Sequence, residues 1–245
     1  MSETNFNQIT AVILAGGLGT RLRTIVADRP KILAPICDKP FLSYILDQLI
    51  EVGIQYTVLC TGYLGEMVQA SFGDHYGTMN LVYSKEQEPL GTAGAIRLAE
   101  GLFKSDLMLV MNGDSYYKTD LNKFRQWHMK KNSKATLLLT HVPDTGRYGQ
   151  VKTAKNGVLE CFVEKGEGGG PGWINAGVYL LDRDFITTIP SGRPVSLEKE
   201  IFPDWIGRSI YGYHSEGHFL DIGIPEDYEK TEEFFKGKTG QQSQT

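Results

Sequence analysis

Cysteine, long apolar runs and excess basic charge are all scarce in this sequence of 245 residues. Cys37, Cys60 and Cys161 are too few and too scattered for a disulfide framework or a CxxC zinc site, which favours a reducing compartment. No apolar stretch approaches the ~18 residues of a membrane span, and the N-terminus lacks a signal-peptide pattern. The net charge of −4 is spread along the chain and disfavours nucleic-acid binding. We therefore expect a soluble cytoplasmic protein without a membrane or nucleic-acid partner.

Glycine, in contrast, is abundant, with 28 residues against 10 prolines. Residues 10–14 form an apolar run that ends in a glycine-rich segment, as a buried strand leading into a loop does. We expect further strands over residues 56–60, 81–84, 107–111 and 135–141, and helices over residues 41–52, 66–72, 93–102 and 121–131. This alternation predicts a mostly parallel sheet covered by helices on both faces, with ligands at the carboxyl ends of the strands.

The pattern changes after Pro143. Residues 150–153, 158–163 and 174–181 are typical of short strands separated by turns, which predicts a smaller and more antiparallel lobe. Helices are expected near residues 197–205 and 226–235. The polar segment 237–245 is expected to be a disordered tail.

The glycine-rich segment after the first strand allows three interpretations. It fails the dinucleotide fingerprint GxGxxG because GLGTRL ends in Leu22, and no Walker spacing GxxxxGK[ST] occurs. A tight turn is the commoner explanation for a Gly-Gly pair. Arg21 and Lys31 favour a phosphate site instead, since two cations beside exposed backbone amides can neutralise a triphosphate.

The motif LAGGLGTRL, residues 14–22, followed by PKILAP, residues 30–35, resembles the signature of the sugar nucleotidyltransferases. Similar short motifs follow in the family's order at residues 86–94, 112–114, 163–165, 175–177 and 221–223. The resemblance implies a Rossmann-like, GT-A-like α/β fold: a mostly parallel mixed sheet flanked by helices, with a smaller sugar-binding lobe. It also implies a single domain over residues 1–236, with a nucleotide-binding half at 10–142 and a sugar-binding lobe with closing segments at 143–236.

The resemblance also implies a set of site residues. The nucleotide would be bound by Leu14, Ala15, Gly16, Gly17, Gly19, Thr20, Glu86, Pro89, Gly91, Thr92 and Asn112. The sugar would be bound by Gly149, Glu164, Lys165, Asn175 and Gly177. Mg²⁺ would be held by Asp114 and Asp221. The catalytic residues would be Arg21, Lys31, Asp114, Lys165 and Asp221.

The chemistry of the implied reaction agrees with these residue types. A sugar 1-phosphate oxygen is already an anion, so its attack on an α-phosphate depends on positioning and charge neutralisation rather than on a general base. Two carboxylates, phosphate oxygens and waters suffice for Mg²⁺. Arg21 and Lys31 would hold the triphosphate and its leaving group, and Lys165 the sugar phosphate. Taken singly, Asp114 would be read as a turn former and each lysine as a solvated side chain.

The sequence also bears on which base the nucleotide carries and on which sugar is the acceptor. Guanine presents two adjacent N–H donors that one carboxylate accepts, whereas uracil and thymine suit an amide side chain. Glu86 lies five residues before Gly91, where uridylyl- and thymidylyl-transferring relatives carry glutamine, and this favours GTP. Gln87 is adjacent, and a shift of one residue would restore UTP or dTTP. The segment WINAGVY, residues 173–179, most resembles the D-glycero-α-D-manno-heptose 1-phosphate guanylyltransferases, with mannose 1-phosphate as the second candidate substrate.

Two other classes of protein remain as alternatives. A nonenzymatic sugar-nucleotide sensor would be expected to have lost some of the cations and carboxylates, all of which are present. A nicotinamide-dependent oxidoreductase would need the fingerprint that is missing here. The resemblance also implies a possible homodimer.

Overall fold

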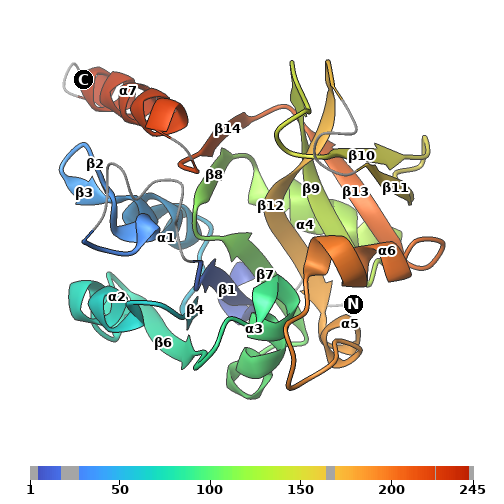
Figure 1. Ribbon diagram of the computed structural model, residues 1–245, viewed down its shortest axis with the longest axis horizontal. Coiled ribbons are helices and arrows are strands. Elements are labelled where there is room, and N and C mark those ends of the chain that lie inside the picture. Colours follow the sequence, from blue (N-terminus) through green and yellow to red (C-terminus); the bar gives the residue numbers. More distant parts are fainter. Residues whose placement is uncertain (1–4, 18–27, 164–168, 224, 243–245) are drawn as a thin grey trace.

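The computed structural model describes residues 5–17, 28–163, 169–223 and 225–242, with side chains to residue 236. A ten-stranded mixed sheet organises the fold (Figure 1). Its parallel part has the order β7-β1-β4-β6, in which every neighbouring pair is parallel. These strands are β1 (Thr10–Ala15), β4 (Tyr56–Thr61), β6 (Met79–Lys85) and β7 (Leu107–Asn112). Their carboxyl ends therefore meet at one edge of the sheet.

The second half of the chain extends the same sheet with mainly antiparallel strands. Strand β12 (Gly172–Asp182) runs antiparallel to β7 on one side and to β9 (Ala135–Val142) on the other. The remaining strands of this sheet are β5 (His75–Tyr76), β10 (Gln150–Thr153), β11 (Leu159–Val163) and β13 (Ile210–Ser215). The antiparallel strands expected after Pro143 are thus found, and the longest of them lies in the middle of the sheet.

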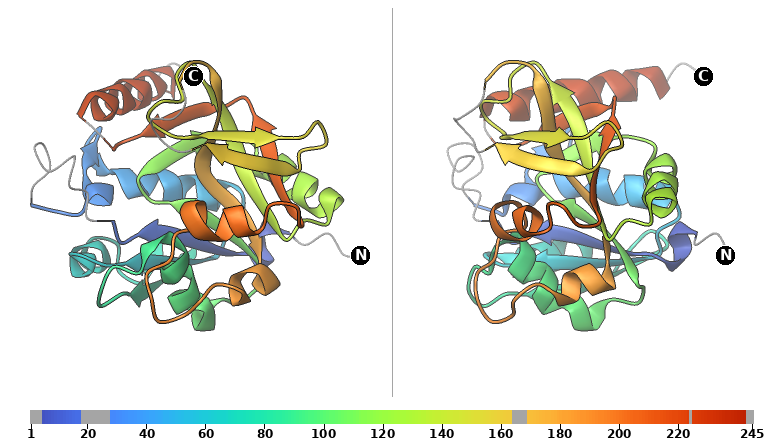
Figure 2. Two further views of the ribbon diagram at one scale, coloured as in Figure 1. Left: turned by 45° about the vertical axis from the view of Figure 1, so that its right-hand side comes forward. Right: turned by 90° about the vertical axis from the view of Figure 1, so that its right-hand side faces the viewer.

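Helices cover both faces of the sheet (Figure 2). One face packs on η1 (Phe6–Gln8), α1 (Phe41–Glu51), α2 (Gly65–Phe72) and α4 (Leu121–Lys131). Helix α7 (Pro225–Gln242) lies beyond α1, where Phe235 stacks on Tyr44. The other face packs on α3 (Gly91–Ala99), α5 (Arg183–Thr187), η4 (Leu197–Ile201) and α6 (Phe202–Asp204). Two further short 3₁₀ turns are η2 (Lys31–Leu33) and η3 (Glu100–Leu102). The predicted α/β class, a mixed sheet flanked by helices, is confirmed.

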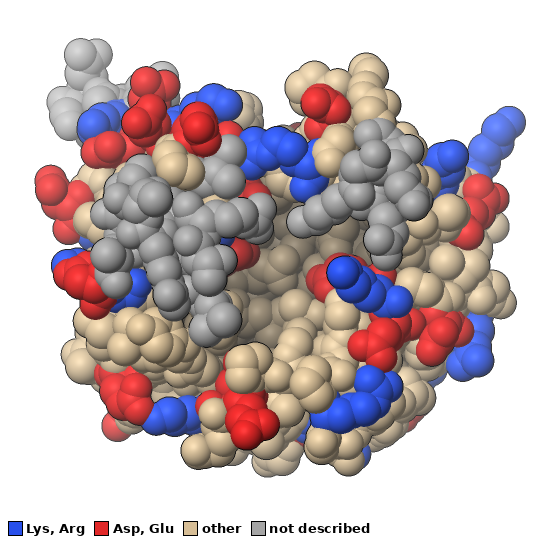
Figure 3. Space-filling model, viewed as in Figure 1, with Lys and Arg blue, Asp and Glu red and all other residues tan. Residues whose placement is uncertain are grey.

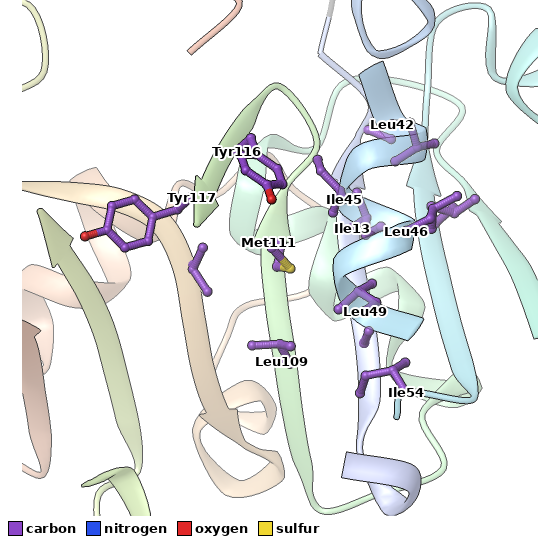
Figure 4. Packing of buried hydrophobic residues seen from close by; sticks show 14 of the residues in the cluster. Ile13, Leu42, Ile45, Leu46, Leu49, Ile54, Leu109, Met111, Tyr116 and Tyr117 are labelled. Carbon is purple, nitrogen blue, oxygen red and sulfur yellow. The ribbon is translucent and has the colours of Figure 1, made fainter. Parts of the chain in front are cut away.

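The alternation of side chains along β1 explains these two layers. Val12 and Ile13 are both fully buried but belong to hydrophobic clusters on opposite faces, as expected for a strand covered on both sides. On the Ile13 face, α1 places four apolar side chains at helical spacing against the sheet, namely Leu42, Ile45, Leu46 and Leu49 (Figure 4). This packing fixes the strand whose carboxyl end leads into the glycine-rich segment.

Two small sheets lie outside the main one. The hairpin of β2 (Pro35–Ile36) and β3 (Lys39–Pro40) precedes α1, and β8 (Ser115–Lys118) pairs antiparallel with β14 (His218–Asp221). The sequence analysis predicted none of these strands, nor β5, α5 or β13.

The C-terminal segment also differs from expectation. Helix α7 continues to Gln242, into the segment expected to be a disordered tail. Gly237 and Gly240 each lower helix propensity by about 1 kcal/mol relative to alanine, but no proline ends the helix there. Among the helices of the described residues, none is long and apolar enough to cross a membrane.

Candidate active site

A cavity of about 430 Å³ lies at the carboxyl ends of the parallel strands. Figure 3 shows a hollow at the centre of this face of the molecule. The residues lining the cavity are Leu14, Ala15, Gly16, Gly17, Lys31, Ile32, Cys60, Glu86, Pro89, Gly91, Thr92, Ala95, Asn112, Asp114 and Gly223. Eleven of the predicted site residues are among them, because strands β1 and β7 and the segment after β6 all end at this edge.

The glycine-rich segment is held close to its neighbours where it leaves β1. The Gly113 amide donates to the Leu14 carbonyl over 2.9 Å, which ties the end of β1 to the end of β7. A Cβ atom on Gly16 would lie only 2.6 Å from the Glu86 Oε1 atom, whereas a Cβ on Gly17 would meet nothing within 4 Å. A Cβ at residue 16 would therefore force the Glu86 carboxylate to move, whereas Gly17 leaves open space.

Glu86 lies in a narrow slot on one side of the cavity. Its Oε2 atom accepts a hydrogen bond from the Leu90 amide at 3.1 Å. Its Oε1 atom lies so close to Gly62 that a Cβ there would be 2.7 Å away. Burial raises the pKa of this carboxyl, against the lowering effect of the Leu90 amide. Gln87 is exposed and is absent from the described residues that line the cavity, so the carboxylate rather than the neighbouring amide faces it.

The segment before η4 contacts the start of α3 through Val195. Gly91 has a φ of +70°, and a Cβ there would lie 2.6 Å from the Val195 carbonyl oxygen. That carbonyl accepts from the amides of Ala93 at 3.0 Å and Gly94 at 3.2 Å. These first amides of the helix, which have no partner within the helix itself, are thus already satisfied by Val195.

Lys31 lies between the two carboxylates predicted to hold a metal. Its Nζ atom is 3.0 Å from Asp114 Oδ2 and 3.7 Å from Asp221 Oδ1. The lysine side chain is only 9% exposed, while that of Asp114 is 49% exposed. Burial, and then the charge of Asp114, raise the pKa of Asp221, and Lys31 opposes them. The fixed cation therefore only partly offsets the repulsion between the carboxylates.

The pairing of β8 with β14 brings these carboxylates together. Asp221 is opposite Ser115 in the ladder, and the Ile222 amide donates to the Asp114 carbonyl over 3.1 Å. The Gly223 amide donates to Asp221 Oδ1 over 2.7 Å, which orients that side chain. The resemblance had linked Asp114 and Asp221, and the structure supplies the unpredicted strands that connect them.

The three predicted sugar-binding residues that the structure describes, Gly149, Asn175 and Gly177, are outside the lining of the cavity. Gly177 has a φ of +75°, and a Cβ there would be 2.6 Å from the Asn112 Nδ2 atom. The Asn175 Oδ1 atom accepts from the Gly177 amide at 2.9 Å. Gly149 lies at the end of the loop before β10, and its amide donates to the Thr145 carbonyl. Gly177 thus adjoins Asn112 and holds Asn175 through its amide, whereas no described contact joins Gly149 to the cavity.

Some predicted residues lie outside the described part of the chain: Gly19, Thr20, Arg21, Glu164 and Lys165. Conversely, four lining residues were not predicted as site residues: Ile32, Cys60, Ala95 and Gly223. Burial raises the pKa of the Cys60 thiol to about 12, so it stays protonated in the wall of the cavity. Its position near the carboxyl end of the expected strand 56–60 was the signal that could have identified it.

Comparisons with known proteins agree with this geometry. Residues 10–237 match the nucleotidyl transferase family. The chain is 39% identical over 223 residues to a D-glycero-alpha-D-manno-heptose 1-phosphate guanylyltransferase of Aneurinibacillus thermoaerophilus, covering 91% of this chain and 96% of that one. It is 36% identical to a mannose-1-phosphate guanylyltransferase of Mycobacterium tuberculosis, covering 91% of this chain and 63% of the relative.

Among solved structures, the crystal structure of HddC from Yersinia pseudotuberculosis complexed with GMP-PN is similar over 93% of this chain and 99% of that chain, with 33% identity and a TM-score of 0.82.

Proposed function

Because this chain belongs to the nucleotidyl transferase family, we propose that it transfers GMP from GTP to a sugar 1-phosphate. The favoured acceptor is D-glycero-α-D-manno-heptose 1-phosphate, and the products are GDP-heptose and pyrophosphate. The observation that carries the base assignment is the Glu86 carboxylate, which faces the cavity while Gln87 is exposed.

Glu86 suits guanine for a chemical reason. Guanine offers N1–H and N2–H side by side, and a carboxylate accepts both where an amide would oppose one of them with its own N–H. The bond from the Leu90 amide and the narrow space beside Gly16 and Gly62 hold the carboxylate in one orientation. The relatives named above carry guanylyltransferase in their names, which supports the same base.

In the proposed reaction, an oxygen of the sugar 1-phosphate forms a bond to the α-phosphorus of GTP. The bond between that phosphorus and the bridging oxygen of the β-phosphate breaks, and pyrophosphate leaves. Gly16 and Gly17 would let backbone amides reach the phosphate oxygens. Lys31 lies in the cavity wall beside Asp114, where it would neutralise charge on the transferred group. Arg21 and Lys165 remain proposed phosphate contacts from the sequence.

The residues present fit Mg²⁺. Asp114 and Asp221 supply hard oxygen donors from two segments. Burial, and then the charge of Asp114, raise the pKa of Asp221, and a cation beside the pair would relieve that repulsion. Among the described residues no group of three or more His, Cys, Asp and Glu could hold a metal by itself. Phosphate oxygens and waters would therefore complete the coordination, and the bound ion would neutralise charge on the reacting phosphates.

Mannose 1-phosphate is the second candidate acceptor, because the mycobacterial relative is a mannose-1-phosphate guanylyltransferase. The heptose assignment is favoured because the relative covered over 96% of its length bears that name. The base assignment is independent of this choice, since both relatives are guanylyltransferases.

The test is release of pyrophosphate with GTP, UTP, dTTP, CTP and ATP, each paired with a panel of sugar 1-phosphates in Mg²⁺. We expect turnover with GTP and the heptose 1-phosphate, and a loss of about 10- to 100-fold in kcat/KM for GTP in Glu86→Gln. Glu88→Gln is the matched control, because Glu88 is exposed two residues away. Turnover with UTP or dTTP alone would refute the base assignment, and no pyrophosphate with any pair would refute the enzyme itself.

A further inference from the structure

The carboxylate of Glu198, which is outside the lining of the cavity, accepts three hydrogen bonds from hydroxyl groups. Tyr179 donates to Oε1 at 3.1 Å, while Thr92 and Ser196 donate to Oε2 at 2.9 and 3.0 Å. Glu198 lies on η4, a π-helical turn, and such turns are rare and frequently found at functional sites. One side chain therefore contacts the start of α3 and the centre of β12.

The direction of these hydrogen bonds is fixed on the base side. Thr92 Oγ1 accepts from the Leu197 amide at 2.8 Å, and Ser196 Oγ accepts from the Lys199 amide at 3.2 Å. The Glu198 carboxylate has no proton to donate, so each hydroxyl directs its only proton to Glu198. Reversing either hydroxyl would remove the acceptor of that proton. Thr92, which was predicted to bind the nucleotide and lines the cavity, thus directs its proton to Glu198.

On the sugar side the direction is set by Glu198. Asn175 Nδ2 donates to the Tyr179 hydroxyl at 2.8 Å, and the Tyr179 hydroxyl in turn donates a hydrogen bond to Glu198. Burial, and then the Glu198 charge, raise the pKa of Tyr179 well above its usual range, so the hydroxyl keeps its proton. Asn175 thereby presents Oδ1 to the Gly177 amide and Nδ2 to Tyr179.

An irregularity in β12 makes this arrangement possible. Asn175 is opposite Leu139 and Tyr179 is opposite Leu137, so the four-residue step along β12 matches a two-residue step along β9. The extra residues include Gly177 in its left-handed conformation, and bulges of this kind often redirect side chains beside active sites. The second hydrogen of Asn175 Nδ2 has no partner given within the described part of the chain.

We propose that Glu198 is a positioning residue that joins the two sides of the site. It holds Thr92 at the base loop and, through Tyr179, fixes Asn175 as a hydrogen-bond donor for a hydroxyl of the sugar. This inference rests on the proposed function, because Asn175 can contact a sugar hydroxyl only if the protein binds a sugar 1-phosphate.

Glu198→Gln separates this role from simple structural support. A glutamine keeps the protons of Thr92 and Ser196 hydrogen-bonded only when its carbonyl faces them, and its NH₂ group then faces Tyr179. Tyr179 must then accept from the glutamine and donate to Asn175. The Asn175 amide would flip to accept that proton, and the Gly177 amide would lose its acceptor. The substitution preserves the shape of the side chain and its hydrogen bonds with Thr92 and Ser196. It reverses the direction of the hydrogen bond between Tyr179 and Asn175.

The experiment measures both Michaelis constants with GTP and the sugar 1-phosphate. For Glu198→Gln we expect the KM of the sugar 1-phosphate to rise about 5- to 20-fold and the KM of GTP to stay within about twofold. Glu198→Ala should raise both. In a Tyr179→Phe background, Glu198→Gln should add less than about twofold, because the relay is already interrupted. Glu200→Gln on the same turn is the control, since its carboxylate contacts Arg193 and the Ser196 amide instead.

A second measurement does not depend on turnover. The Gly177 amide resonance, followed by NMR in the ligand-free protein, should move in the direction of a weaker hydrogen bond in Glu198→Gln and stay in place in Glu200→Gln. An unmoved Gly177 resonance, or equal rises in both KM values for Glu198→Gln, would overturn the inference. An inactive wild-type enzyme would instead refute the proposed function, and the NMR comparison would still decide whether Glu198 orients Asn175.

Discussion

The parallel and antiparallel halves of the sheet contribute to the site in different ways. In the parallel half, residues that line the cavity follow directly from the ends of strands β1 and β7 and from the segment after β6. In the antiparallel half, Asn175 and Gly177 lie in the middle of β12, where a change of register turns the chain toward Asn112. In the parallel half, the ends of the strands position the site residues. In the antiparallel half, the change of register within β12 positions them.

The comparison predicts that substitutions in the two halves change different kinetic constants. Residues at the edge of the parallel half lie beside the proposed nucleotide and should affect kcat or the KM of GTP. Residues in the irregular part of β12 should affect the KM of the sugar. The following predictions test this division.

The largest effect is expected for Asp114→Asn, just beyond β7. The amide loses the negative charge that pairs with Lys31 and is proposed to hold Mg²⁺, so kcat should fall by about 10²- to 10³-fold. Nucleotide binding should partly survive, because Glu86 and the glycine segment are unchanged. Pyrophosphate release and equilibrium binding of a GTP analogue measure the two quantities. Full activity in this variant would remove Asp114 from the proposed metal site.

A smaller effect on a different constant is expected for Gly177→Ala. Gly192→Ala is the matched control, because both glycines have a φ of +75° but a Cβ at residue 192 meets nothing within 4 Å. Both variants should lose about 1 kcal/mol of unfolding free energy from the left-handed conformation. Only in Gly177→Ala does the new Cβ lack room, so that the chain must shift where the residue 177 amide holds Asn175, and the KM of the sugar 1-phosphate should rise by about tenfold. A fall in kcat with an unchanged sugar KM would break the proposed division.

The smallest effect is the pH dependence of GTP binding. Burial raises the pKa of Glu86, so this carboxyl takes up a proton at a higher pH than an exposed glutamate does. The protonated form accepts fewer hydrogen bonds from guanine, and the KM of GTP should therefore rise a few-fold as the pH falls from about 8 to about 5. Glu86→Gln carries no titrating group there and should lack this component, which separates it from titration of the phosphates themselves. Parallel pH profiles in the two proteins would contradict the role of Glu86.

The same contrast explains what the sequence could predict. Strands β1, β4, β6 and β7 were predicted within a few residues. Three of them are largely buried runs, and β6 has a partly buried apolar centre. Their order predicted that Leu14, Glu86 and Asn112 would meet at one edge. The assignment of Asp114 and Asp221 came from resemblance to a family, since neither residue has a local pattern that announces a ligand.

The parts that were missed depend on pairing between distant segments. Strands β8 and β14 have four residues each, and their stability comes from each other rather than from an apolar run. The irregularity around Gly177 cannot be read from the segment NAGVY alone, because register is defined only against β9. The contacts of Glu198 likewise join residues far apart in the sequence.

The ladder between β8 and β14 also has a consequence for local opening of the structure. Ser115 pairs with Asp221 in a two-stranded sheet with four residues in each strand, and so short a ladder outside the main sheet opens more readily than the central strands do. Opening it would separate Asp221 from Asp114 while the ends of β1 and β7 stay paired. A substitution that weakens this ladder would therefore disperse the proposed metal site without changing either carboxylate.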